Sequence, residues 1–134
     1  MTRSQRVRVV AALIEREGEI LIAQRPFQGV FPGKWEFPGG KVRPDERDEA
    51  ALARELEEEL NVRPRIGARV AEIDHDYSHL SVKILFYRCF LDGRELLHPR
   101  EHAELRWVRP SELTSFDFLE ADLDLVEQLK DGKL

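Results

Sequence analysis

The stretch GKVRPDERDEAALARELEEELNV, residues 40–62, combines a glycine-containing segment with a cluster of acids at helical spacing. Glu55, Glu58 and Glu59 lie three and four residues apart, so a helix places all three carboxylates on one face. Like charges at these spacings each destabilise an isolated helix by roughly 0.2–0.5 kcal/mol. Such a cluster is therefore typical of a face that meets solvent or a divalent cation, which takes oxygen ligands.

The other face of this helix is predicted to be apolar. It carries leucines that recur every four positions and one alanine beside them: Leu52, Leu56, Leu60 and Ala53. This spacing predicts an amphipathic helix from about Asp48 to Leu60, and Pro64 prevents its continuation. A solvated charged helix is the alternative interpretation of the acids.

The segment before the helix favours a functional interpretation over a solvated surface. FPGGKV, residues 37–42, predicts a tight glycine turn, and a further acid, Glu46, lies between this turn and the helix. Arg54 directly precedes Glu55. An ordinary amphipathic helix explains neither the turn nor the spacing of Glu46, Arg54 and Glu55.

Together these residues resemble the Nudix box, which runs from a glycine through a glutamate to Arg-Glu-apolar, then Glu-Glu, and ends in Gly-apolar. The positions are filled here by Gly40, Glu46, Arg54, Glu55, Leu56, Glu58, Glu59, Asn61 and Val62. Asn61 replaces the final glycine, and Asn is the residue after glycine that best tolerates the left-handed conformation past a helix end. Arg47 stands where the family commonly has Ser or Thr, so Asp45 or Asp48 is expected to cap the helix.

The resemblance implies a metal site built from one glycine carbonyl and four carboxylates: Gly39, Glu55, Glu58, Glu59 and Glu101. The expected ion is Mg²⁺, with Mn²⁺ as the alternative, bridging to a polyphosphate. Arg54 is expected to pair with Glu46 or a neighbouring carboxylate and to orient it. Lys41 is expected to steady the departing charge. Glu55 is the favoured general base, and Glu101 is the alternative.

The resemblance extends over most of the chain and is nearest to the MutT-like nucleoside triphosphate pyrophosphohydrolases. It implies that Arg25 reaches the substrate phosphates. The alternative is an arginine after a strand that is only solvated. The resemblance places Glu101 in a loop that contributes an extra metal ligand, whereas Arg100 and His102 beside it suggest a surface charge cluster. Asp122 corresponds to a residue that hydrogen-bonds the base, or it is an acid that favours a helix N-terminus.

Aromatic residues and histidines give weaker signals. Tyr77 and Phe31 are candidates for stacking on a base, or for packing in the core. Two pairs of histidines are spaced four residues apart: His75 with His79, and His98 with His102. Because Pro99 interrupts any helix in the second pair and the first lies in an expected turn, all four are predicted in surface loops rather than at a metal.

The function that the resemblance implies is hydrolysis of (deoxy)nucleoside triphosphates to a monophosphate and pyrophosphate, with water attacking the β-phosphorus. Removal of oxidised nucleotides such as 8-oxo-dGTP is the leading interpretation. A CTP- or dCTP-preferring or general triphosphate pyrophosphohydrolase is the alternative. A Nudix-fold regulator that binds a nucleotide without cleaving it is the alternative from a different class.

Composition agrees with one small enzyme domain over residues 1–134. A net charge of −5 argues against long nucleic acid as a partner, and Arg3, Arg6 and Arg8 are expected at a solvated strand edge. The only cysteine, Cys89, is expected to pack in a strand. No apolar run has the length of a membrane span, so we predict a cytoplasmic protein with a small nucleotide substrate and no membrane contact. Monomer and homodimer remain equally open.

The order of predicted elements indicates an α+β fold of the Nudix type, a mixed β-sheet sandwiched between helices (an α/β/α sandwich). Strands are expected at Val7–Ile14, Ile20–Gln24, Trp35–Phe37, Arg65–Asp74, Val82–Leu91 and Leu105–Val108. Hairpin turns are expected at residues 17–19 and at Asp92-Gly93. A closing helix is expected at Leu119–Lys130.

Overall fold

The computed structural model describes residues 6–92 and 96–134. Its strands are β1 (Val7–Arg16), β2 (Glu19–Gln24), β3 (Trp35–Glu36), β4 (Gly39–Lys41), β5 (Arg65–Tyr77), β6 (Leu80–Phe90) and β7 (Glu104–Val108). Its helices are α1 (Asp48–Leu60), the 3₁₀ turns η2 (Pro110–Ser115) and η3 (Glu120–Asp122), and α2 (Leu123–Lys130). Arg3 and the Gly93 part of the expected Asp92-Gly93 reversal lie outside the described residues.

The strands form one mixed sheet in the order β3-β2-β1-β6-β5, with β4 added to β1 and β7 added to β2. β1 runs parallel to β6 and antiparallel to β2 and β4, so it lies in the middle of the sheet. The expectation of a strand edge at Arg8 is therefore wrong, although its side chain is exposed, and Arg6 lies just before the strand. Their charges are paired instead: Arg6 with Asp76 at 2.6 Å, and Arg8 with Asp48 at 2.7 Å.

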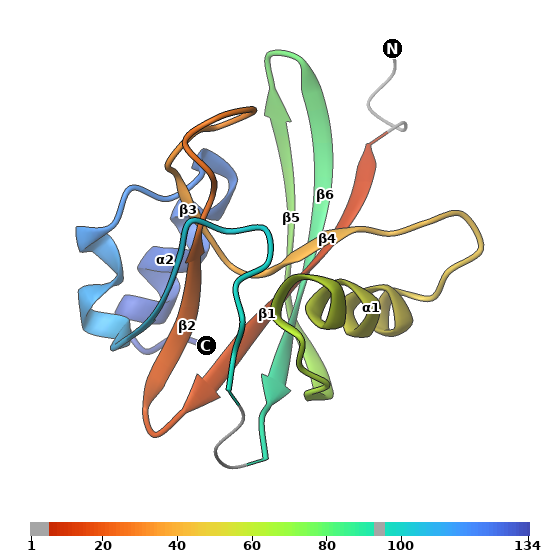
Figure 1. The fold of residues 1–134 in the computed structure, drawn as a ribbon. Coiled ribbons are helices and arrows are strands. Elements are labelled where there is room, and N and C mark those ends of the chain that lie inside the picture. The colour runs from red at the N-terminus through yellow and green to blue at the C-terminus, as the bar shows by residue number, and fades with distance from the viewer. Residues whose placement is uncertain (1–5, 93–95) are drawn as a thin grey trace.

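Helices cover both faces of this sheet (Figure 1). On one face α1 packs Leu52, Leu56 and Leu60, all fully buried, against alternate residues of the central strands. On the other face η2 and α2 pack against the remaining residues of the same strands, including Leu13 and Phe86. The predicted sandwich is confirmed, because each strand of its centre is apolar on both sides.

Several predicted details differ in the structure. Ala53 is exposed, and Ala51 takes its place on the buried side of α1. β5 continues to Tyr77, so His75 belongs to a strand rather than to the following turn. The closing helix begins as the 3₁₀ turn η3 and becomes α-helical only at Leu123. Among the described residues, none of the helices is long and apolar enough to cross a membrane.

The predicted glycine turn at residues 37–42 is a strand. Gly39 and Gly40 lie in β4 opposite Ala11 and Val10 of β1, and neither has a positive φ. A glycine is needed for close approach here, since a Cβ on Gly39 would lie 2.0 Å from the carbonyl oxygen of Val10. The two glycines therefore allow β4 to pack closely on its neighbours, and they do not reverse the chain.

Candidate active site

Helix α1 carries the acids and is fixed at both ends without the expected cap. Its first flanking residue, Arg47, makes no side-chain cap hydrogen bond, and neither Asp45 nor Asp48 replaces it. The Asp48 carboxylate instead accepts hydrogen bonds from the Arg8 guanidinium at 2.8 and 2.7 Å, which ties the helix to β1. At the other end Asn61 adopts the predicted left-handed conformation, with φ of 58°.

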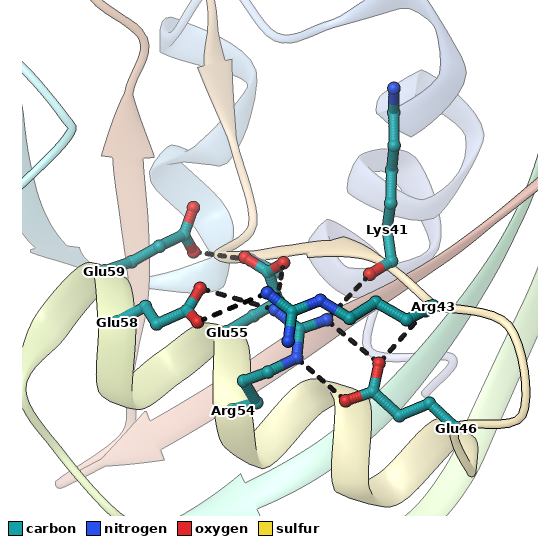
Figure 2. Close-up of polar contacts among 8 residues, drawn as sticks. Lys41, Arg43, Glu46, Arg54, Glu55, Glu58 and Glu59 are labelled. Carbon is teal, nitrogen blue, oxygen red and sulfur yellow. Dashed lines mark hydrogen bonds and ion pairs between the residues drawn. The ribbon is translucent and has the colours of Figure 1, made fainter.

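The three carboxylates of the acid cluster (Glu55, Glu58 and Glu59) rise from one side of α1 toward β4 (Figure 2). They differ in burial: Glu59 is buried, Glu55 is half-buried and Glu58 is exposed. The backbone N–H of Gly39 donates a hydrogen bond to Glu59 Oε1 at 3.2 Å. The spacing on one helix thus gives the three acids different degrees of burial.

Close packing against β4 fixes the position of Glu55. A Cβ on Gly40 would lie 2.3 Å from Cδ of Glu55, well inside contact distance. The glycine at this position therefore leaves room for the carboxylate itself. This explains in physical terms why the segment before the acidic helix contains two glycines: the first approaches the backbone of β1 and the second approaches a side chain of α1.

Arg54 lies at the centre of the cluster and makes the predicted pair with Glu46. Its Nε is 2.8 Å from Glu46 Oε2, and a second guanidinium nitrogen is 3.0 Å from Oε1. The third nitrogen donates to Glu55 at 3.0 Å and to Glu58 at 3.3 Å. The hydrogen bond from Arg54, with one from the backbone of Arg43, lowers the pKa of Glu46 to about 2. Glu46 is therefore a negative charge that holds the Arg54 guanidinium beside Glu55 and Glu58.

The buried member of the cluster has an unusual charge environment. Burial raises the pKa of Glu59 to about 9, and the charges of Glu36, Glu55 and Glu101 add to the effect. Burial also raises the pKa of Glu55, more than the neighbouring Arg54 lowers it. A buried carboxylate surrounded by other acids is typical of a cation site, and Arg54 offsets only the charges of Glu55 and Glu58 here.

The residues present fit a divalent cation in their chemistry. Their carboxylate oxygens are the ligands that Mg²⁺ and Mn²⁺ prefer, and the raised pKa of Glu59 reflects its burial and, after that, the negative charges around it. Within residues 6–92 and 96–134, however, no three His, Cys, Asp or Glu side chains are grouped closely enough to hold an ion. Glu58 is directed to Arg54 and lies 3.8 Å from Arg43. The structure thus supplies the donors, with Glu55 and Glu58 both paired to Arg54.

A cleft of about 550 Å³ opens beside the acid cluster. Its lining includes β4 residues and Glu59 from the acidic side: Gly39, Gly40, Lys41 and Glu59. It also includes an aromatic cluster, which we define as Phe31, Tyr77 and His79, whose ring centroids lie 4.7 to 6.2 Å apart. Polar groups and flat rings therefore face one space, which suits a ligand with a charged and an aromatic part.

Two predicted phosphate-binding residues line this cleft. Arg25 follows β2, and its guanidinium donates to the carbonyl oxygen of Val30 at 2.9 Å and to Glu36 at 3.2 Å. These two bonds hold the side chain, so the alternative of a freely solvated arginine does not describe it. Lys41 is exposed, and Figure 2 shows its ammonium group pointing away from the acid cluster.

Asp122 lies in the same cleft and is buried, with 4% of its surface exposed. Burial raises its pKa well above the ordinary value, and the charge of Glu36 raises it further. Although Asp122 precedes α2, its side chain makes no cap hydrogen bond to that helix. Its place directly before α2 still suits the alternative of an acid that favours the helix dipole, which needs no hydrogen bond. The neighbouring Ala121 N–H donates to the Tyr77 hydroxyl at 3.0 Å, which ties η3 to the aromatic cluster.

Glu101 is exposed and does not line the cleft, but its loop is attached to the acidic helix. The N–H of Arg100 donates to the carbonyl oxygen of Glu59 at 3.0 Å, and that of His98 donates to Leu60 at 3.1 Å. The charge of Glu101 raises the pKa of both Glu55 and Glu59. The structure thus brings the residue within electrostatic reach of the acid cluster.

Glu36 also lines the cleft and was not predicted from the sequence. Glu36 of β3 lies between Trp35 and Phe37. Its carboxylate accepts a hydrogen bond from Arg25 at 3.2 Å and lies 2.9 Å from Nε2 of His102. A single acid between two aromatic residues in a strand was the available signal. The prediction of a surface position for His102 is wrong, since its side chain is 3% exposed.

Comparison with known proteins matches this geometry to one family. A family model described as NUDIX domain matches residues 9–128. The CTP pyrophosphohydrolase of Escherichia coli (strain K12) is 41% identical over 121 residues, covering 90% of this chain and 89% of its own. The putative 8-oxo-dGTP diphosphatase 2 of Mycobacterium tuberculosis (strain ATCC 25618 / H37Rv) is 39% identical over 124 residues, covering 90% and 86%.

Solved structures show the same fold. The solution structure of the E. coli ORF135 protein has a TM-score of 0.76 and 40% identity, over 95% of this chain and 91% of its own. The crystal structure of a MutT protein from Methanosarcina mazei Go1 has a TM-score of 0.83 and 26% identity, over 94% of each chain.

Proposed function

The chain belongs to the Nudix hydrolase family, and from this premise we propose that it is a Mg²⁺-dependent hydrolase of nucleoside triphosphates that releases a nucleoside monophosphate and pyrophosphate. The observation that carries the proposal is the shared cleft. Gly39, Gly40, Lys41 and Glu59 line it together with Phe31, Tyr77 and Asp122. A triphosphate needs the first set and a base needs the second.

The acid cluster, with the Gly39 carbonyl and Glu101, holds the ion in this proposal. A bound divalent cation neutralises the polyphosphate and activates water. Glu55 accepts the proton of the attacking water, a role that suits a carboxylate with a raised pKa. Arg54 keeps Glu55 and Glu58 oriented through its hydrogen bonds.

Arg25 and Lys41 bind the phosphate oxygens in this proposal. Arg25 already lines the cleft with its guanidinium fixed by Val30 and Glu36, so little side-chain freedom is lost when a phosphate binds. Lys41 is a flexible point charge on β4, free to follow the departing pyrophosphate. Charge-assisted hydrogen bonds of this kind are about twice as strong as neutral ones.

For the base, we propose an oxidised purine nucleotide such as 8-oxo-dGTP as the leading substrate, with Asp122 as the group that reads it. The similarity to a putative 8-oxo-dGTP diphosphatase supports this choice. The similarity to a CTP pyrophosphohydrolase supports CTP or dCTP as the second candidate. Asp122 serves either, because a carboxyl of raised pKa can both donate and accept a hydrogen bond.

The test is pyrophosphate release with Mg²⁺ from the four common dNTPs, their ribonucleotide counterparts and 8-oxo-dGTP, compared as kcat/KM. A preference of orders of magnitude for 8-oxo-dGTP supports nucleotide sanitation, and a cytosine preference supports the second candidate. No turnover of any of them, with tight nucleotide binding retained, favours a binding regulator. Parallel assays with Mn²⁺ and with a chelator identify the ion.

Labelled water tests the position of attack. If water attacks the β-phosphorus, oxygen-18 enters pyrophosphate and the monophosphate stays unlabelled. Label in orthophosphate, with a nucleoside diphosphate as the other product, would show that the enzyme is not a pyrophosphohydrolase.

A further inference from the structure

His102 is buried and has a single polar partner among the described residues. Its Nε2 lies 2.9 Å from Glu36 Oε2, its side chain is 3% exposed, and Nδ1 is buried without a hydrogen bond. Glu36 forms an ion pair with Arg25, and an ionised carboxylate can only accept hydrogen bonds. Nε2 therefore carries the hydrogen and donates to Glu36, which assigns the tautomer.

This hydrogen bond joins two strands across a third. Glu36 of β3 and Leu105 of β7 both pair with Ala23 of β2, so β3 and β7 lie along opposite edges of β2. His102 lies two residues before β7 and reaches over the end of β2 to β3. β3 has only two residues, and the backbone of Trp35 also bonds to Asp117 and Leu119, so the side-chain tether adds to these backbone bonds in fixing Glu36.

Glu36 passes this constraint on to Arg25. One carboxylate oxygen accepts from His102 and the other from Arg25, at 3.2 Å. Arg25 also donates to the carbonyl oxygen of Val30. Both Arg25 and Glu36 line the cleft, whereas His102 does not. A donor on each oxygen fixes the plane of the carboxylate, and the plane of the carboxylate fixes the guanidinium.

We propose that His102 is a positioning residue: through Glu36 it holds the Arg25 guanidinium in the orientation that binds the phosphate groups of the substrate. The inference rests on the proposed function in taking a nucleotide polyphosphate as the ligand of Arg25. The chemistry would be the same for any triphosphate, whatever its base. An effect through Arg25 therefore concerns phosphate binding and leaves the choice of base unchanged.

The test compares two variants of His102 with a control in the same loop. His102→Leu removes the donor, and His102→Gln keeps an amide N–H at the place of Nε2. We expect His102→Leu to raise KM for the preferred triphosphate on the order of tenfold, the size expected when a hydrogen bond to a charged group is lost, with a smaller change in kcat. His102→Gln is expected to restore most of KM. The exposed His98, changed to Leu, is expected to leave both parameters unchanged.

A double-mutant cycle separates positioning from general stabilisation. In the Arg25→Ala background, His102→Leu is expected to have no further effect on KM, because the group that it positions is gone. A full tenfold rise in that background would overturn the proposal. A second result would also overturn it: in His102→Leu, kcat falls by as much as KM rises, Tm is lowered, and His102→Gln restores neither parameter.

Binding of a triphosphate analogue keeps this test independent of turnover. The probe carries an imido group between the α- and β-phosphorus, and its Kd is measured with Mg²⁺ by calorimetry for the same variants. Suppose that the wild-type protein cleaves no nucleotide, that His102→Leu still raises Kd tenfold, and that it has no effect on Kd in the Arg25→Ala background. The proposed function then fails and the positioning role stands. If turnover is normal and Kd is the same in all His102 variants, the positioning role fails alone.

Discussion

The acid cluster and the aromatic cluster meet at one cleft, lined by Glu59 of the first and by all three rings of the second, but they are assembled in different ways. Glu55, Glu58 and Glu59 come from consecutive turns of one helix, so a few residues of sequence bring them together. Phe31, Tyr77 and His79 come from the loop after β2, the end of β5 and the following turn, and they meet only in the folded chain. Local spacing therefore builds the part that binds charge, and tertiary structure builds the part that meets the base.

This difference predicts which property each cluster controls. A change in the acid cluster acts on the reacting phosphorus and is expected to lower turnover of every substrate. A change beside the aromatic cluster alters only the contacts with one base, so it is expected to change the ranking of substrates.

Glu58→Gln is expected to have the largest effect. The substitution keeps the size and helix propensity of the residue and removes one ligand charge. We expect kcat to fall at least about 100-fold, because even groups that only support a metal ligand cost 10- to 100-fold when they are changed. Steady-state kinetics with each triphosphate measures the loss, and it should be similar for all bases.

The matched control is Glu57→Gln on the same helix. Glu57 is exposed and bonds to Arg63 at 2.9 Å, on a different side of α1 from the cleft. Its substitution is expected to leave kcat and Tm unchanged. Wild-type turnover in Glu58→Gln would remove Glu58 from the metal site, and a loss confined to one base would contradict the division between the two clusters.

Gly40→Ala is expected to act next most strongly, and only on chemistry. The added Cβ meets the flexible end of Glu55, which can move aside, so the fold is retained while the carboxylate is displaced. We expect a loss in kcat of roughly 10- to 100-fold. Gly39→Ala is the contrasting variant: its Cβ meets the backbone of β1 at 2.0 Å, and we expect roughly 1–3 kcal/mol less stability.

Urea unfolding and turnover together separate these two glycines. Unfolding free energies measured for both variants should show the loss in Gly39→Ala alone. Normal kcat in Gly40→Ala would mean that the position of Glu55 in this structure is not needed for the reaction.

The sequence predicted the acid cluster well because its geometry is local. The bounds of α1 follow from the leucine period and Pro64, and the left-handed Asn61 follows from its side chain. The glycines were misread as a turn because glycine in a sequence does not distinguish a positive φ from a close approach. Only the pairing of β4 with β1 decides between them.

The other side of the cleft was less predictable. Nothing local to Glu36 or His102 indicates that they meet, since they are separated by 66 positions and bridge β2 from opposite edges. Their hydrogen bond depends on the order of strands in the sheet, which no short-range pattern contains. Asp122 was found through a family resemblance; its burial was not foreseen.

Asp122→Ala is expected to change substrate preference more than turnover. Removing a hydrogen-bonding group changes the ratio of kcat/KM between the preferred and the other bases on the order of tenfold. The measurement is the ratio for 8-oxo-dGTP, dGTP and dCTP in the variant and in the wild type. An equal loss on every triphosphate would show that Asp122 supports the structure and would weaken the contrast between the clusters.

The last expected effect concerns folding and not catalysis: it is the pH dependence of stability in the metal-free protein. Because the pKa of Glu59 is raised from 4.5 to about 9, the folded state keeps a proton that the unfolded chain releases. This contribution to stability is complete below pH 4.5 and is lost as pH rises toward 9, by at most about 1.4 kcal/mol per pH unit. The raised pKa of Asp122 acts in the same direction. Urea unfolding at several pH values in the presence of a chelator measures the slope.

Mg²⁺ should separate the contribution of Glu59 from that of Asp122, because the ion is expected to bind the ionised carboxylates of the acid cluster and not Asp122. Adding the ion is expected to reduce the slope as far as Glu59→Gln does, since metal binding favours the deprotonated ligand and strengthens with pH. The part that remains is expected to disappear in Asp122→Asn. A stability that does not change with pH in the wild-type protein with chelator would mean that Glu59 is ionised when folded. If the effect of Mg²⁺ on the slope survives in Glu59→Gln but is lost in Asp122→Asn, the ion binds beside the aromatic cluster instead.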